Sequence, residues 1–154
     1  MHDREHFLRK AVQLARGNID AGGRPFGAVV VKGGKVIATG VNQILATRDP
    51  TSHAELNAIR NASQAIGAPD LSGCVVYASG HPCPMCLAAM RMAGITEVYF
   101  AYSNEDAAPF GLSTAAVYAE LAKPLAEQAM TFRHVPIHAE SGEALYAEWK
   151  RRAG

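Results

Sequence analysis

Two short segments carry side chains that could hold a metal ion. The first reads His53-Ala54-Glu55, and the second reads Pro82-Cys83-Pro84-Met85-Cys86. Zinc takes imidazole nitrogen and thiolate sulfur as ligands, and a C-x-x-C at the start of a helix can aim both sulfurs at one ion. His53, Cys83 and Cys86 would supply three protein ligands and leave a fourth position open for water. That arrangement is typical of a catalytic zinc site, whereas structural sites are closed by four protein ligands.

Glu55 lies two residues beyond His53 and is predicted to face the open metal position without ligating the ion. Zinc lowers the pKa of a water on the ion from about 15.7 to about 7, which supplies a nucleophile at neutral pH. A carboxylate beside that water can take its proton and return it to a leaving group. Because such acid–base help contributes about 10²- to 10⁴-fold in rate, we predict that Glu55 is the catalytic residue.

Helices and strands must bring the two segments together. The hydrophobic spacing, turn residues and helix signals predict helices over about 3–21, 54–66, 84–94, 112–121 and 141–152, strands over 26–31, 36–41, 74–78 and 97–101, and an ambiguous strand over 130–137. The first two strands flank Gly33-Gly34 and form a hairpin. Strands that alternate with helices after this hairpin predict an α/β fold, a three-layer α/β/α sandwich with a mixed five-stranded sheet. His53 and Cys83 both fall at predicted helix starts, whose positive ends favour thiolate over thiol.

Composition narrows the class of protein. The chain has 154 residues, 49% of them hydrophobic and 19% charged, so we expect one folded domain over 1–154 rather than a disordered chain. The formal net charge of +1 shows no basic excess for nucleic acid. No apolar run approaches the length of a membrane span, and the charged start lacks a signal-peptide core. We therefore expect a cytoplasmic protein with no membrane partner, in which three cysteines favour reduced thiols or metal ligation over disulfides.

An H-x-E at one helix start followed by P-C-x-x-C at the next is the signature of the zinc nucleobase deaminases. The chain resembles the cytidine deaminase superfamily, and within it the bacterial guanine deaminases. The resemblance runs along nearly the whole chain, through segments 24–32, Asn42, 49–55, 82–87 and 104–108.

This resemblance implies a cytidine deaminase-like fold and hydrolytic deamination of a free heterocyclic base, with guanine, giving xanthine and ammonia, as the leading substrate. It also implies a homodimer in which the C-terminal helix, about 140–154, packs on the partner subunit near its active site. The residues that it assigns are His53, Cys83 and Cys86 as zinc ligands, Glu55 as proton shuttle, and Phe26, Asn42 and Ala54 as the lining of the base pocket.

Three positions depart from the guanine deaminases. Those enzymes carry an acid that meets the N–H donors of guanine, where this chain has Gly111-Leu112-Ser113-Thr114. Asp106 or Glu143 could substitute for it. An aromatic residue is replaced by Met92, and the Glu before the first motif proline by His81. Cytosine, or another small aminated purine, pyrimidine or triazine, is therefore the alternative substrate.

Two further functions stay open. A tRNA adenosine deaminase would share the metal motifs, but the near-neutral charge and the lack of a dense basic C-terminal helix argue against it. A structural zinc module or a redox C-x-x-C protein would have no use for Glu55. Cys74 is predicted to be a small buried hydrophobic residue; as a fourth ligand it would close the zinc site.

Overall fold

The computed structural model describes residues 2–138 and 142–154. The chain divides into two units, one that runs to Ala119 and one from Glu120 to Gly154, and each is described by itself. The first unit contains all four strands of the described residues and both predicted metal-binding segments.

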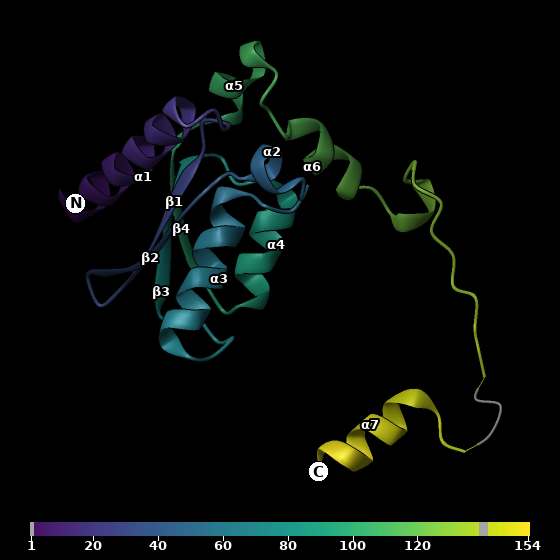
Figure 1. Ribbon diagram of the computed structural model, residues 1–154. Helices are drawn as coiled ribbons and strands as arrows, with labels where there is room; N and C mark the ends of the chain where they lie inside the picture. The colour runs from purple at the N-terminus through teal and green to yellow at the C-terminus, as the bar shows by residue number, and fades with distance from the viewer. Residues whose placement is uncertain (1, 139–141) are drawn as a thin grey trace. The chain divides into compact units, whose positions relative to one another are not determined.

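A mixed sheet forms the middle of the first unit (Figure 1). Its strands are β1 (Gly27–Lys32), β2 (Lys35–Val41), β3 (Cys74–Gly80) and β4 (Glu97–Tyr102), in the order β2-β1-β3-β4. β1 is antiparallel to both of its neighbours, and β3 and β4 are parallel. The predicted hairpin is confirmed, since Gly33 and Gly34 adopt φ values of 58° and 76°, which suit glycine, in the turn between β1 and β2.

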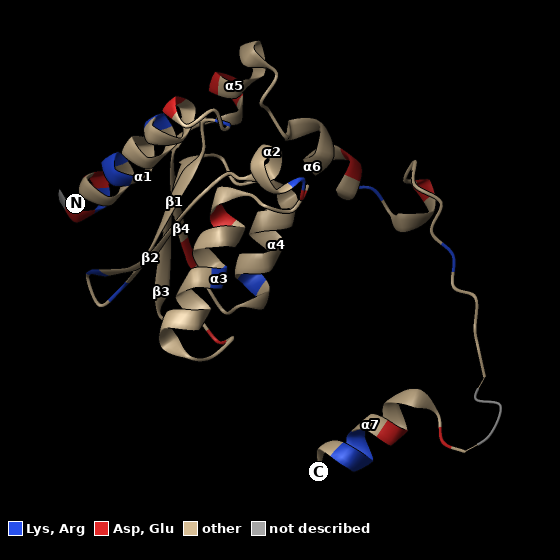
Figure 2. Ribbon diagram, in the orientation of Figure 1, with Lys and Arg blue, Asp and Glu red and all other residues tan. Residues whose placement is uncertain are grey.

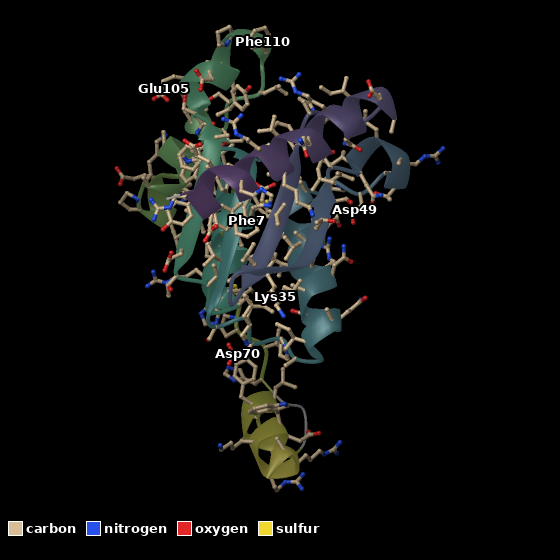
Figure 3. The ribbon with its side chains drawn as sticks, turned by 90° about the vertical axis from the view of Figure 1, so that its left-hand side faces the viewer. Phe7, Lys35, Asp49, Asp70, Glu105 and Phe110 are labelled. Atoms are coloured by element: carbon tan, nitrogen blue, oxygen red, sulfur yellow. The ribbon has the colours of Figure 1, made fainter. Side chains whose placement is uncertain are left out.

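Helices cover both faces of this sheet. α1 (His2–Asp20) covers one face, and α3 (Ala54–Ile66) with α4 (Pro84–Met92) covers the other (Figure 1). Successive side chains of a strand point to opposite faces, so Val29 packs with the α1 layer and Val30 with the α3 layer. Phe7 of α1 lies over the sheet in Figure 3 and contacts Tyr77, with ring centroids 5.1 Å apart. The predicted three-layer sandwich is confirmed.

The prediction of five strands is wrong for the residues that the structure describes, which form four. Residues 130–137 contain no strand and are exposed along their whole length. A strand needs a neighbour for its backbone hydrogen bonds, and the described part of the second unit offers none. The apolar side chains that suggested a strand remain in solvent, with Phe132 at 68% and Ile137 at 88% exposure.

Short helices were harder to predict. The structure adds α2 (Ile44–Thr47), α5 (Asn104–Ala107) and the 3₁₀ turns η1 (Ala108–Phe110) and η2 (Leu125–Glu127). The helix expected over 112–121 begins later, as α6 (Ala115–Leu121), and the last helix is α7 (Leu145–Ala153). Its predicted start, at about 140 or 141, lies outside the described residues.

None of the described helices is long and apolar enough to cross a membrane. Lys and Arg are interspersed with Asp and Glu along α1 (Figure 2).

Strand β2 approaches α3 so closely that Gly40 has no room for a side chain. A Cβ there would overlap the Ala54 carbonyl oxygen and the Ala58 nitrogen, which are backbone atoms of the first turns of α3. We expect Gly40→Ala to lower the free energy of unfolding by about 1–3 kcal/mol or more, since overpacking against backbone cannot be relieved by a rotamer change. Urea denaturation measures this change.

Gly17→Ala is the matched control. Gly17 lies within α1, and nothing lies within 4 Å of a Cβ built there. Alanine in a helix interior is favoured over glycine by about 0.5–1 kcal/mol, so this variant should gain stability. A Gly40→Ala protein as stable as Gly17→Ala would contradict the close approach of β2 to α3.

Candidate active site

Three potential metal ligands converge from two helix starts. His53 is the N-cap residue of α3, Cys83 is the N-cap residue of α4, and Cys86 lies in the first turn of α4 behind Pro84. His53 Nδ1 lies 3.4 Å from the Sγ atoms of both cysteines, which are 3.5 Å apart. Within residues 2–138 and 142–154 this is the one cluster of His, Cys, Asp and Glu with metal-binding geometry.

The donor set fits zinc. Sulfur and nitrogen ligands about 2.3 Å and 2.0 Å from a tetrahedral ion lie about 3.5–3.8 Å from one another. The observed separations of 3.4–3.5 Å differ from these by only a few tenths of an ångström. Two sulfurs and one imidazole nitrogen are ligands that zinc prefers, and three of them leave one tetrahedral position open. Cys74 does not close the site, because it is not part of this cluster; it is buried in the hydrophobic core with Leu71 and Val76.

Hydrogen bonds among the three ligands prepare one thiolate before a metal binds. The hydrogen bond with Cys86, and after it the hydrogen bond with His53, lowers the pKa of the Cys83 thiol to about 4. The hydrogen bond between His53 and Cys83 raises the pKa of His53. The hydrogen bond between Cys86 and Cys83, together with burial, raises the pKa of the Cys86 thiol. Because zinc needs a second thiolate and a neutral imidazole, binding must release protons from this cluster.

Glu55 lies beside the ligands in the first turn of α3 and is only 7% exposed. Burial raises the pKa of its carboxyl group to about 7, and the charge of Cys83 acts in the same direction. A carboxyl group with a pKa close to the working pH can both accept and donate a proton. The position and the protonation equilibrium of Glu55 therefore suit the role predicted from H-x-E.

A cavity of about 200 Å³ opens beside the cluster. It is lined by Arg24, Phe26, Asn42, His53, Glu55, His81, Cys83 and residues 111–114. The structure thus brings Phe26 and Asn42 together with the metal cluster, as predicted. Ala54, predicted to contribute its backbone, is fully buried between His53 and Glu55 and is not among the lining residues.

Asn42 is held in place on several sides. Its backbone N–H donates to the Phe26 carbonyl at 3.2 Å, and its own carbonyl accepts from the Asn18 side chain at 2.8 Å. Its side-chain oxygen accepts from the Ile44 N–H at 3.1 Å. The side-chain NH₂ group therefore remains as a fixed hydrogen-bond donor at the cavity.

Asp106 and Glu143, which were predicted as possible substitutes for the missing acid, are each paired with another residue. Asp106 closes a capping box with Ser103, whose N–H it accepts at 2.9 Å, and it lines a neighbouring cavity of about 570 Å³. Glu143 pairs with Arg151 at 2.6 Å within the second unit. Met92 is 88% exposed on α4 and does not line the catalytic cavity. His81 does line it, against the ring of Phe100.

Arg24 and Tyr118 were not among the predicted site residues. Arg24 lies three residues before β1 begins and supplies the basic side chain of the cavity lining. Tyr118 of α6 reaches the loop before Cys83, where its hydroxyl donates to the Pro82 carbonyl. No local pattern marks Tyr118, because its partner lies 36 residues away along the chain.

Known proteins are similar to this chain in sequence. Residues 1–102 match the family model described as the cytidine and deoxycytidylate deaminase zinc-binding region. A guanine deaminase from Bacillus subtilis is 44% identical over 134 residues, which cover 86% of each chain. A tRNA-specific adenosine deaminase from Aquifex aeolicus is 36% identical over 97 residues, covering 63% of this chain and 64% of the relative.

Solved structures agree with the sequence matches. The crystal structure of the Bacillus subtilis guanine deaminase superposes with a TM-score of 0.85 at 40% identity, covering 97% of this chain and 94% of that one. A guanine deaminase from Nitrosomonas europaea superposes with a TM-score of 0.67 at 30% identity, covering 70% of this chain and 63% of that one. Because the family model matches residues 1–102 and the Bacillus subtilis relative is 44% identical over 134 residues, this chain belongs to the zinc-binding cytidine and deoxycytidylate deaminase family.

Proposed function

We propose that this chain hydrolyses guanine to xanthine and ammonia. The observation that carries the proposal is the convergence of His53, Cys83 and Cys86 with the buried Glu55 at one cavity. The guanine deaminase from Bacillus subtilis, which matches most of this chain in both sequence and structure, supports guanine as the substrate. His53, Cys83 and Cys86 would hold zinc, whose Lewis acidity makes water nucleophilic at neutral pH.

Glu55 is proposed to move the protons of the reaction. Its carboxylate accepts a proton from the attacking water and delivers it to the departing amino group, which leaves as ammonia. Burial of Glu55 and its pKa of about 7 support this role, because the group can hold the proton between the two steps. The exclusion of solvent around Glu55 keeps that proton within the site.

The cavity supplies hydrogen-bond donors for the acceptor atoms of guanine. Guanine presents O6 and N7 as acceptors. Asn42 offers its NH₂ group, Arg24 offers its guanidinium, and the Ser113 hydroxyl oxygen accepts from the Ala115 N–H, so its hydrogen can point to a ligand. Phe26 gives an apolar surface for the ring. We propose that these donors select guanine although Gly111–Thr114 carry no acid.

A panel of bases tests the substrate. Zinc-loaded protein is incubated with guanine, adenine, cytosine, isocytosine, ammeline, guanosine and cytidine, and ammonia release is measured. We expect guanine to give the highest kcat/KM, by at least about 10-fold, because adenine and cytosine present an amino group where guanine presents O6. Turnover of another base with guanine inert would refute guanine as the substrate and leave the deaminase chemistry standing.

We also propose that the whole chain works as one domain within a homodimer. β4 pairs only with β3 among the described strands, so its outer edge can accept another strand. The second unit offers exposed apolar side chains at Phe132, Ile137 and Trp149. Exposed apolar side chains of this kind are typical of an interface. A second copy of the chain would supply a fifth strand beside β4 and a surface on which α7 packs.

Neighbouring substitutions on α7 test the dimer. Trp149 is 66% exposed and apolar, whereas Lys150 follows it in the basic last turn of the helix. We expect Trp149→Glu to weaken self-association by about 30-fold, the loss of an aromatic anchor of about 2 kcal/mol. Lys150→Glu should leave association within a few-fold of wild type. Sedimentation velocity over a concentration series gives both values, and a monomeric wild-type chain would refute the dimer.

A further inference from the structure

Tyr118 contacts the metal-binding loop but takes no part in the proposed reaction. It lies on α6, is half-buried, and donates its hydroxyl hydrogen to the Pro82 carbonyl. Its ring meets His81 edge to face, with centroids 5.3 Å apart and planes inclined by 63°. Tyr118 therefore holds both residues that precede the ligand Cys83.

The composition of this loop makes that contact important. Pro82 and Pro84 have no backbone N–H, so Cys83 carries the single N–H of the three residues. Carbonyl groups therefore help to orient residues 82–84, alongside the N–H of His81, which donates to the Tyr102 carbonyl at 2.8 Å. The Cys83 carbonyl accepts from the Leu87 N–H at 2.9 Å within α4, while the buried Pro82 carbonyl accepts from Tyr118. The Tyr118 hydroxyl thus fixes the peptide plane that leads into Cys83.

The other end of this connection is the wall of the catalytic cavity. The Tyr118 N–H donates to the Thr114 carbonyl at 3.1 Å in the first turn of α6. Thr114 lines the cavity, and its N–H and hydroxyl both donate to the Asn104 side-chain oxygen, at 3.2 Å and 3.5 Å. One short helix therefore links the cavity wall to the loop that carries a metal ligand.

We propose that Tyr118 is a positioning residue that sets the direction of the Cys83 sulfur and holds the wall at Gly111–Thr114 against the substrate. The inference rests on the proposed function, since it concerns the same metal site. In this proposal, the Tyr118 hydroxyl on α6 sets both the geometry of the metal ligands and the shape of the cavity wall.

Tyr118→Phe tests this role, because it removes the hydroxyl and keeps the ring against His81. We expect the zinc dissociation constant, measured by competition with a chromophoric chelator, to rise about 10-fold, as for other groups that orient metal ligands. The absorption bands of the Co²⁺-substituted protein should shift, since they report the ligand geometry. KM for guanine should rise more than kcat falls.

Tyr99→Phe is the matched control. Its hydroxyl also makes one hydrogen bond, to Glu97 at 2.9 Å, but on the exposed surface of β4. We expect its zinc affinity and Co²⁺ spectrum to equal those of wild type. A Tyr118→Phe protein with wild-type zinc affinity and spectrum, and only a lower melting temperature, would overturn the proposal.

Asn104→Ala tests the cavity wall separately from the metal-binding loop. It also provides a second measurement should Tyr118→Phe fail to fold. It releases Thr114 from Asn104 and leaves the Tyr118–Pro82 hydrogen bond in place. We expect a raised KM with an unchanged Co²⁺ spectrum. An equal spectral shift in Asn104→Ala would overturn the assignment to Tyr118. The metal measurements need no substrate, so an error about guanine would leave them unaffected.

Discussion

Glu55→Gln is expected to lower kcat/KM for guanine by about 10²- to 10⁴-fold while the protein still binds zinc. Glutamine has the shape of glutamate but cannot carry a proton from the attacking water to the leaving amino group. The ligands His53, Cys83 and Cys86 are untouched, so metal content should stay at the wild-type level. Ammonia release and zinc analysis on the same sample measure both quantities.

The stability of Glu55→Gln separates lost chemistry from lost folding. Burial holds the pKa of Glu55 at about 7, above the ordinary value of 4.5 for a glutamate. The folded protein therefore binds a proton that the unfolded chain has released, so the stability of the metal-free protein falls as pH rises from about 4.5 to 7. Glutamine removes this cost. We expect metal-free Glu55→Gln to be at least as stable as wild type at pH 8.

Glu105→Gln provides the comparison for activity. Glu105 is an exposed carboxylate on α5, away from the sheet in Figure 3, and does not line the catalytic cavity. We expect wild-type kcat/KM. Equal rates for Glu55→Gln and Glu105→Gln would falsify the proposed proton transfer.

Removal of zinc is expected to abolish activity and to lower the free energy of unfolding by about 3–4 kcal/mol at zinc concentrations of 100 to 1,000 times the dissociation constant. The three ligands join the first turns of α3 and α4, so loss of the ion also loosens the contact between these helices. Thermal unfolding with and without chelator measures the change, and added zinc should restore both properties.

Two cysteine variants test whether the stabilisation by zinc depends on the predicted ligands. Cys86→Ser removes a ligand, and we expect its melting temperature to be insensitive to the chelator. Cys74→Ala changes a buried thiol outside the metal cluster, so its response should match that of wild type. Because the Cys86 thiol and His53 must lose protons when zinc binds, affinity should also fall as pH is lowered. Chelator sensitivity in Cys86→Ser would contradict the ligand assignment.

Short-range sequence patterns were sufficient to predict the two helix starts that carry His53 and Cys83. His53 and Cys83 were expected at helix starts because each follows a loop and precedes apolar residues at helical spacing, and both are N-cap residues in the structure. The hairpin followed from Gly33-Gly34, whose conformation few other residues adopt. The two helix starts meet because β3 lies between α3 and α4 along the chain, a short α/β connection that the sequence pattern predicts.

Contacts between residues far apart along the chain could not be predicted from the sequence pattern. Thr114 of the cavity wall is held by a hydrogen bond to the side chain of Asn104, ten residues earlier, and Tyr118 reaches back 36 residues to Pro82. Neither contact has a periodic signature. The segment 130–137 shows the converse: its apolar composition favours a strand, but a strand exists only where a partner is available.

The cavity wall at Gly111–Thr114 follows β4 along the chain, whereas the metal ligands and Glu55 begin α3 and α4. This part of the cavity wall, which includes Ser113, thus belongs to a different segment from the proposed metal ligands and Glu55. Under the proposed function, substitutions within 111–114 are therefore expected to change which base is accepted without altering His53, Glu55, Cys83 or Cys86. The same separation makes this stretch the natural place for a designed library aimed at new aminated heterocycles.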